Sequence, residues 1–168
     1  MDYHIRDMLG SDIEAKGFVH WKSWHETYKG LIDTRYLEEH VTLERRIRAA
    51  HRQGTANTLV ALVDGKVVGF CTYDVSQDGD LENCGEIGAF YVLQAFQKQK
   101  IGYALMQEAL KRLQSFDRVA VWVLASNENA IRFYKKVGFA KDGITKELNL
   151  GSTVYEKRMI LDRTKASL

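Results

Sequence analysis

The residues best suited to chemistry lie where an apolar strand passes through a basic turn into a helix, at 91–106, with the sequence YVLQAFQKQKIGYALM. The first turn of a helix has backbone N–H groups without intrahelical partners and a partial positive charge, so a turn packed against it can bind phosphate oxygens. Gly102 and Ala104 keep this helix start small, and Lys98 and Lys100 add positive charge. The segment therefore predicts a cradle for a diphosphate.

A second block of polar and aromatic residues, NENAIRFYKKVGF at 127–139, follows the apolar strand 119–124. In this order and spacing, the two blocks resemble the acetyl-CoA-binding core of the GNAT superfamily of N-acetyltransferases. The resemblance covers roughly residues 57 to 161. It implies an acyltransferase that uses acetyl-CoA as co-substrate and requires no metal.

The resemblance also implies which residues hold the co-substrate. Backbone groups of Tyr91, Val92 and Leu93 would pair with the pantetheine arm like an added strand, with an N–H near Val92 polarising the acetyl carbonyl. Asn127 and Asn129 are candidates to bind the pantetheine amides, although Asn127 is also placed to cap a helix. The full predicted cofactor-binding set is Phe90, Tyr91, Val92, Leu93, Gln97, Lys98, Gln99, Lys100, Ile101, Gly102, Tyr103, Ala104, Asn127, Asn129 and Tyr134.

The cradle departs from the family pattern at Lys100, which stands at the first glycine of that pattern, whereas Gln97 and Gly102 fit it. If this position needs a positive φ angle, lysine costs on the order of 1–2 kcal/mol. A phosphate bound to the ammonium would offset part of that cost. We therefore expect Lys100 to affect CoA affinity more than the fold.

Two residues are candidates for catalytic proton transfer. In the resembling family, a tyrosine at the place of Tyr134 points its hydroxyl at the sulfur, as a general acid for the departing thiolate; the alternative is a core tyrosine with its hydroxyl at the rim. Many members place an acidic residue on the strand of Glu86 to deprotonate the ammonium, and a solvated side chain is the alternative. Alternation predicts that Glu86 shares a face with Phe90 and Val92. Gly88 is a candidate for a bulge that opens the sheet.

One stripe of the first long helix is aromatic, because Trp21, Trp24, His25 and Tyr28 follow one another at helical spacing. Spacing alone favours a stripe that faces the core. In the family's arrangement, however, this helix helps to wall the acceptor pocket. Trp24 and Tyr28 are therefore the predicted substrate-binding residues, which would enclose an ammonium by cation–π contact.

Length and composition indicate one globular catalytic domain, at 1–161, followed by a C-terminal tail at 162–168. The chain has 168 residues, of which 45% are hydrophobic and 27% charged, with a formal net charge of +2. This charge argues against a nucleic-acid partner, and no segment approaches the roughly 20 apolar residues of a membrane span. We expect a cytoplasmic protein in which Cys71 and Cys84 are buried, reduced thiols.

The expected fold class is α/β (α+β), a single GNAT-like domain with a mixed, mostly antiparallel sheet flanked by helices, in the order β-α-α-β-β-β-α-β-α-β-β. An Asp-Gly pair at 64–65 predicts a hairpin. The predicted strands are 3–6, 59–63, 66–73, 84–93, 118–124, 139–149 and 153–161, and the predicted helices are 12–28, 34–53, 101–115 and 127–137.

The resulting hypothesis is an acetyl-CoA-dependent N-acetyltransferase in which a primary amine attacks the thioester directly. A polyamine or another small amine is the first expectation for the acceptor. A peptide N-terminus or a protein lysine is the alternative within the enzyme class, and a catalytically weak CoA-binding regulatory module is the alternative outside it. Pairing of exposed strand ends into a homodimer stays open.

Overall fold

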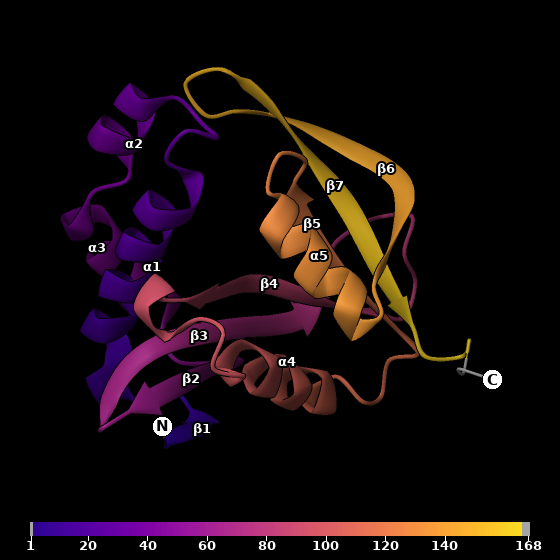
Figure 1. Ribbon diagram of the computed structural model, residues 1–168. Coiled ribbons are helices and arrows are strands. Elements are labelled where there is room, and N and C mark those ends of the chain that lie inside the picture. Colours follow the sequence, from indigo (N-terminus) through magenta and orange to yellow (C-terminus); the bar gives the residue numbers. More distant parts are fainter. Residues whose placement is uncertain (1, 166–168) are drawn as a thin grey trace.

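The computed structural model describes residues 2–165, in which a seven-stranded sheet carries helices on both faces (Figure 1). The sheet has the order β1-β2-β3-β4-β5-β7-β6, with a parallel β4–β5 pair among antiparallel pairs. The strands are β1 (Tyr3–Asp7), β2 (Thr58–Val63), β3 (Lys66–Val75), β4 (Cys84–Val92), β5 (Arg118–Leu124), β6 (Ala140–Asn149) and β7 (Thr153–Asp162). The α-helices are α1 (Ile13–Tyr28), α2 (Thr34–His40), α3 (Leu43–Gln53), α4 (Ile101–Arg112) and α5 (Glu128–Val137). This architecture confirms the predicted fold class.

The predicted helix at 34–53 is wrong in one respect, because the structure divides it into α2 and α3. Val41 leaves the helical region with φ −106° and ψ 74°, and Thr42 is extended. The Thr42 side chain then accepts a hydrogen bond from the backbone N–H of Arg45 at 3.3 Å, which caps α3. Two adjacent β-branched residues, the second with a capping hydroxyl, therefore end one helix and begin the next.

A bulge in β4 confirms the prediction made for Gly88. Phe90 pairs with Cys71 of β3, but Tyr73 pairs with Ile87, so β4 has one more residue than β3 over this interval. The Thr72 hydroxyl oxygen accepts a hydrogen bond from the Ala89 N–H at 2.7 Å and so satisfies the disrupted ladder.

Strands β4 and β5 separate immediately after this point. They pair over 84–87 and 118–121, and the second half of β4 has no partner on its β5 side in the described part of the chain. Figure 1 shows the two strands diverging, with α4 and α5 beside the opening. The opening exposes the backbone edge of β4 at 88–92.

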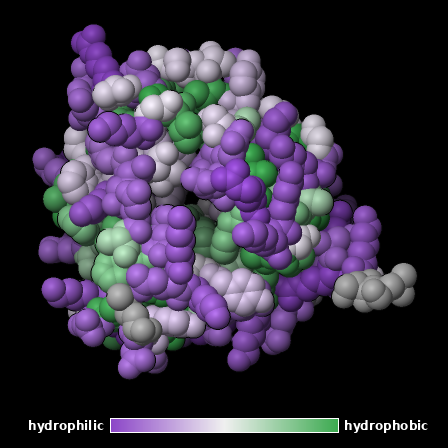
Figure 2. Space-filling view, viewed as in Figure 1, coloured by the Kyte–Doolittle hydropathy of each residue, from purple (hydrophilic) through white to green (hydrophobic). Residues whose placement is uncertain are grey.

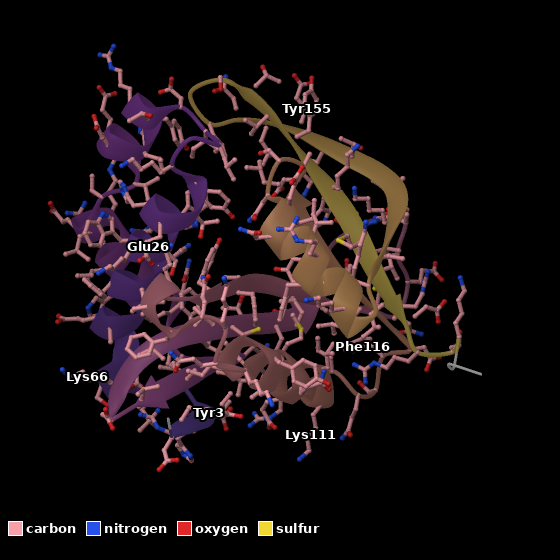
Figure 3. All side chains as sticks on the ribbon, viewed as in Figure 1. Tyr3, Glu26, Lys66, Lys111, Phe116 and Tyr155 are labelled. Carbon is pink, nitrogen blue, oxygen red and sulfur yellow. The ribbon has the colours of Figure 1, made fainter. Side chains whose placement is uncertain are left out.

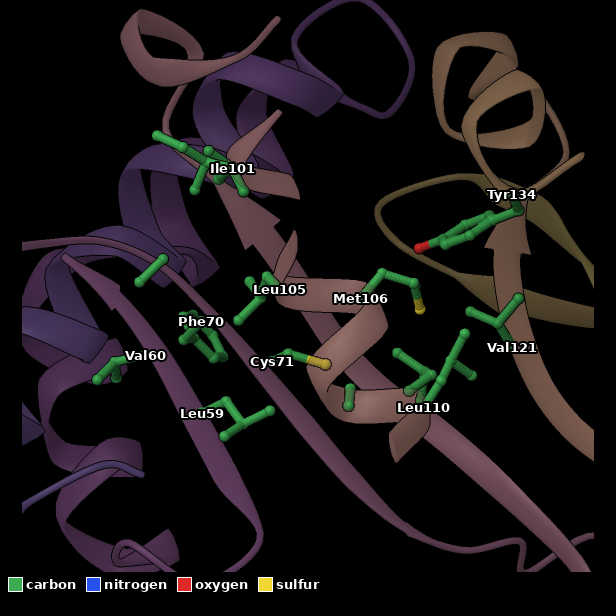
Figure 4. Close-up of a cluster of buried hydrophobic side chains, with 14 of the residues drawn as sticks. Leu59, Val60, Phe70, Cys71, Ile101, Leu105, Met106, Leu110, Val121 and Tyr134 are labelled. Carbon is green, nitrogen blue, oxygen red and sulfur yellow. The ribbon is translucent and has the colours of Figure 1, made fainter. Parts of the chain in front are cut away.

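The main core lies between the sheet and the helices α4 and α5. Figure 4 shows Cys71, Leu105 and Met106 packed there, whereas Phe70 lies on the α1 face of β3 with its ring centroid 5.5 Å from that of His20, and all four residues are buried. Cys71 and Cys84 are free and buried, as predicted. A smaller cluster on the other face joins α1 and α2 to the end of β5 through residues that include Ile32, Leu37, Val41 and Leu124. None of the described helices is long and apolar enough to cross a membrane.

Arg158 of β7 ties the loop before β4 to the edge hairpin β6–β7. Its side chain is 3% exposed and donates to Asp80 at 2.6 and 2.8 Å, to Asp142 at 2.7 Å and to Asp78 at 3.3 Å. The indole N–H of Trp122 donates to the same Asp78 oxygen at 3.1 Å. The buried guanidinium thus holds together three carboxylates that would otherwise repel one another.

We predict that Arg158→Met lowers the melting temperature by roughly 5–10 °C, because it leaves the three aspartates clustered without their cation. Arg35→Met is the matched control, since Arg35 pairs with Glu39 at 2.8 Å on the exposed surface of α2. Thermal unfolding measured by circular dichroism checks this prediction. Equal losses in the two variants would contradict it.

Candidate active site

The bulge reverses the side-chain alternation along β4. A Cβ on Gly85 would contact Leu113 and Phe116, beside α4, so the adjacent Glu86 points to the α1 face. Beyond the bulge, Phe90 stacks on Phe133 of α5 with 5.4 Å between ring centroids. The prediction that Glu86 shares a face with Phe90 and Val92 is therefore wrong, because it carried strict alternation through the extra residue.

The β4 edge that faces the opening has a backbone donor available at Val92. The Leu93 N–H donates to Val68 of β3 at 2.9 Å, and the Leu93 carbonyl accepts from Phe96, so both polar groups of Leu93 are engaged. Since N–H directions alternate along a strand, the Val92 N–H points away from β3 and into the opening. The predicted position of a carbonyl-polarising N–H therefore has the required direction.

The basic turn leads from this edge into α4. Gln97 donates its side-chain amide to the Val92 carbonyl at 2.9 Å, which fixes the turn to the end of β4. Lys100 is the N-cap residue of α4 with φ +67°, so this position does need a positive φ, where a lysine is strained. Lys98 also has a positive φ of 62°. A Cβ on Gly102 would lie 3.8 Å from Phe90 and Val92, in ordinary contact.

These features fit a diphosphate and its pantetheine arm. The first turn of α4 directs its free N–H groups toward the turn, and Lys98 and Lys100 are exposed beside it together with Tyr103, which is 54% exposed. Ile101 is fully buried and anchors the helix start, and Ala104 bonds back to the Lys100 carbonyl at 3.0 Å. Within residues 2–165, the side-chain amide oxygen (Oε1) of Gln99 is buried without a hydrogen-bond partner.

The two asparagines lie at the start of α5, across the opening. Asn127 caps this helix, because its side-chain oxygen accepts from the Ala130 N–H at 3.2 Å. Asn129 is exposed, and its side-chain oxygen accepts from Arg132. Both oxygens are therefore engaged, whereas neither side-chain NH2 group donates to a described protein atom, so each is available to a ligand carbonyl.

Tyr134 projects from α5 into the interior of the opening, and Figure 4 shows its hydroxyl directed away from the helix toward the side of Met106. The residue is 7% exposed. Burial raises the pKa of the Tyr134 hydroxyl above its usual value, and the nearby Tyr91 and Cys71 act in the same direction. The hydroxyl is therefore protonated at neutral pH and can donate a proton or a hydrogen bond.

Two carboxylates lie on the opposite, α1 side of the opening. Burial raises the pKa of Glu86, with a further contribution from Asp78, and Lys146 opposes the shift. Burial also raises the pKa of Glu156 of β7, again opposed by Lys146. Glu156 was not predicted from the sequence. Glu156 reaches the site because β7 pairs with β5 so that Glu156 lies opposite Leu124, and the sequence alone does not reveal this register.

The predicted acceptor residues of α1 contact the side chain of Tyr91 of β4. The Trp24 indole N–H donates to the Tyr91 hydroxyl at 3.0 Å, and the Trp24 and Tyr28 rings are 4.6 Å apart. Burial and a hydrogen bond with Tyr91 raise the pKa of Tyr28 well above its usual value. Trp24 and Tyr28 also pack on the smaller core cluster, which confirms the core-facing interpretation of the aromatic stripe, while their binding of an acceptor stays a prediction. Tyr91 was predicted for its backbone alone, yet its side chain belongs to this group.

Side chains converge on this region from two directions. Figure 3 shows them entering the space between the α1–α3 side and the β5–α5–β7 side, and Figure 2 shows the surface hollowed between the same two sides. Tyr155, labelled in Figure 3, is 49% exposed on β7, so its neighbour Glu156 points to the other side of the strand. A cavity of about 180 Å³ adjoins this face and is lined by residues that include Lys16, His20, Thr72 and Ala89.

Comparisons with known proteins show the family to which the chain belongs. Residues 20–139 match the acetyltransferase (GNAT) family model, and the chain belongs to this family. It is 30% identical over 164 residues to the L-amino acid N-acetyltransferase AaaT of Escherichia coli, covering 96% of this chain and 97% of that protein. It is 27% identical to an N-alpha-acetyltransferase of Sulfurisphaera tokodaii, covering 82% and 80%.

A solved relative contains CoA. The PaiA N-acetyltransferase of Thermoplasma acidophilum, in complex with coenzyme A, has a TM-score of 0.69 and 25% identity, covering 94% of this chain and 98% of that one. The protein is therefore a GNAT N-acetyltransferase, an enzyme of the acyltransferase class with a fold that binds acetyl-CoA. Within residues 2–165, no group of three or more His, Cys, Asp or Glu side chains is arranged to hold a metal ion.

We predict that Lys100→Gly raises the free energy of unfolding by about 1 kcal/mol, because it removes the strain of a positive φ. The greater conformational entropy of glycine in the unfolded chain offsets part of this gain. Lys100→Ala is the matched control, since it removes the ammonium but keeps the Cβ. Urea unfolding checks the difference. Both variants should bind acetyl-CoA several-fold more weakly, and a Lys100→Gly protein no more stable than Lys100→Ala would contradict the account.

We predict that Glu156→Gln loses less stability than wild type when the pH rises from 4 to 7. A carboxyl with a raised folded-state pKa holds its proton more tightly in the folded state, so its contribution to stability falls as the pH rises from 4.5 through the raised value. Glutamine has no such dependence. Melting temperatures across this range, with Glu147→Gln on the exposed edge strand β6 as control, measure the effect, and parallel curves for wild type and Glu156→Gln would refute it.

Proposed function

We propose that this enzyme transfers the acetyl group of acetyl-CoA to a small primary amine by direct attack on the thioester. The observation that carries the proposal is the opening between β4 and β5, which has the Val92 N–H on its edge and the Tyr134 hydroxyl inside it. The start of α4 lies on one side of this opening and the carboxylates Glu86 and Glu156 on the other. Donor and acceptor would thus approach the reacting carbon from opposite faces of the sheet.

Each step has a residue suited to it. The amine must lose a proton, and Glu86 or Glu156, whose pKa values are raised, would accept it directly or through water. The amine nitrogen bonds to the acetyl carbon while the Val92 N–H stabilises the charge on the carbonyl oxygen. The C–S bond then breaks, the Tyr134 hydroxyl supplies a proton to the thiolate, and the proton that the new amide nitrogen loses restores the Tyr134 hydroxyl by way of solvent. Positioning by the strand edge contributes to the rate as well.

Relatives bear names that point to different acceptors. The Escherichia coli relative is named for L-amino acids and the Sulfurisphaera relative as an N-alpha-acetyltransferase. Polyamines and other small amines remain within the proposal, because Trp24 and Tyr28 offer aromatic faces to an ammonium and two carboxylates lie nearby. A peptide N-terminus is the second candidate, and the Sulfurisphaera relative's name supports it.

We predict that Tyr134→Phe lowers kcat roughly 100-fold, because it removes a proton donor. Its affinity for acetyl-CoA should stay within about twofold of the wild-type value, because the ring is kept. Release of free CoA thiol across polyamines, amino acids, aminoglycosides and short peptides measures this. Tyr155→Phe, on the exposed face of β7, is the control. Unchanged turnover in Tyr134→Phe would remove it from the mechanism, and tight acetyl-CoA binding without turnover on any amine would favour the regulatory module.

The same assay identifies the base. The carboxylate must be ionised to accept a proton, so kcat/KM should rise with pH through a value above 4.5. Glu86→Gln and Glu156→Gln are compared, and the substitution that abolishes the acid limb of the profile marks the base. A limb retained in both variants would exclude both residues.

A further inference from the structure

A cation without a counter-ion lies in the wall of the acceptor region. Arg46 of α3 places its guanidinium carbon 4.6 Å from the centroid of the Trp24 ring. Its Nε is buried and has no hydrogen-bond partner, and no carboxylate within residues 2–165 lies at ion-pair distance from it. Arg48, two residues further along α3, is paired with Glu44 at 2.6 Å. Arg45 and Arg52 of α3 also have no ion pair in the described part of the chain but are exposed, so Arg46 is the arginine of α3 that is both half-buried and without a counter-ion.

The packing of α1 against α3 places Arg46 there. A Cβ on Gly17 of α1 would lie 2.8 Å from the Cα of Ile47, so this glycine allows the two helices to approach closely. Arg46 precedes Ile47, and Trp24 lies two turns beyond Gly17 on α1. The glycine thus sets the guanidinium against the indole, where it is half-buried.

The groups around Arg46 are hydroxyls and rings. Burial lowers the pKa of Arg46, and Tyr91, Tyr36 and Tyr28 oppose this shift. Tyr28 and Tyr91 also lie near Glu156. The hydroxyl pair of Tyr28 and Tyr91 therefore lies near both an unpaired cation, Arg46, and the carboxylate of Glu156.

We propose that Arg46 binds the carboxylate of the acceptor, and that the acceptor is a free amino acid whose amine lies toward Glu156 and Glu86. This inference rests on the proposed function and names its substrate class. A half-buried cation without a partner is costly, and a bidentate carboxylate is the ligand that satisfies a guanidinium. The same cation repels a polyamine, which would bring further positive charge to Trp24.

The test compares each acceptor with its counterpart that lacks the carboxyl group. The pairs are L-phenylalanine with 2-phenylethylamine, L-leucine with 3-methylbutylamine and L-lysine with 1,5-diaminopentane, and spermidine is added. Wild type should prefer the amino acid within at least one pair. Arg46→Gln should raise KM for that amino acid roughly 10- to 100-fold and leave KM for its counterpart within about twofold.

Two further variants separate recognition from stability. Arg46→Lys keeps the charge without the planar fork and should recover part of the affinity. Arg45→Gln, on the exposed side of the same helix, should change neither KM nor kcat. Melting temperature and acetyl-CoA affinity are measured for every variant, so a folding defect is recognised as a loss shared by both members of a pair.

Binding to the CoA-saturated protein, measured by calorimetry, provides a readout that does not need turnover. If no amine releases thiol but the amino acids bind and Arg46→Gln abolishes that binding, the proposed function fails and the carboxylate site stands. If thiol is released but carboxyl-free amines or spermidine are preferred in every comparison, or if Arg46→Gln weakens both members of a pair equally, the inference is overturned. Failure of every amino acid to bind overturns it as well.

Discussion

The extra residue that β4 carries opposite Thr72 determines both halves of the site. It turns the side chains of Phe90 and Val92 toward α4 and α5, and it turns Tyr91 toward α1, where Glu86 also points. It lies where β4 leaves β5, so the Val92 N–H faces an opening instead of a neighbouring strand. A regular strand would have continued the ladder and closed this edge. One inserted residue therefore gives the sheet the geometry that the proposed site requires, with the co-substrate on one face and the acceptor on the other.

Charge differs sharply between the two faces of that opening. The co-substrate side combines a helix start with Lys98 and Lys100, which suits a diphosphate. The α1 side has two half-buried carboxylates whose pKa values are raised and, near a pair of tyrosine hydroxyls, a half-buried arginine without a counter-ion. Burial of unpaired charge lowers stability, and such charges cluster at functional sites. The fold compensates elsewhere, through Arg158 and its three aspartates and through a dense core between the sheet and α4.

Local signals in the sequence predicted most of the fold. The Asp64-Gly65 hairpin, the bulge at Gly88 and the helix start after Lys100 each depend on a few adjacent residues, and the structure contains all three. The division between α2 and α3 was missed because the capping role of Thr42 competes with a helical pattern that continues around it. The orientation of Glu86 was missed because the bulge was recognised but its effect on alternation was not applied.

The remaining parts of the site depend on contacts distant in sequence. Glu156 joins the site through the pairing of β7 with β5, and Arg46 through the close approach of α1 and α3 at Gly17. Register and helix crossing are fixed by tertiary packing, which a single sequence does not specify. The predicted co-substrate residues, by contrast, belong to two continuous segments, and for that reason the sequence alone could propose them together.

The central claim is that the opening between β4 and β5 receives the thioester. A crystal structure of the complex with acetyl-CoA tests it most directly. The account predicts the acetyl oxygen within hydrogen-bond distance of the Val92 N–H, the sulfur next to the Tyr134 hydroxyl and the diphosphate at the start of α4. An acetyl group bound elsewhere, or a complex in which Val92 contacts no part of the ligand, would contradict it.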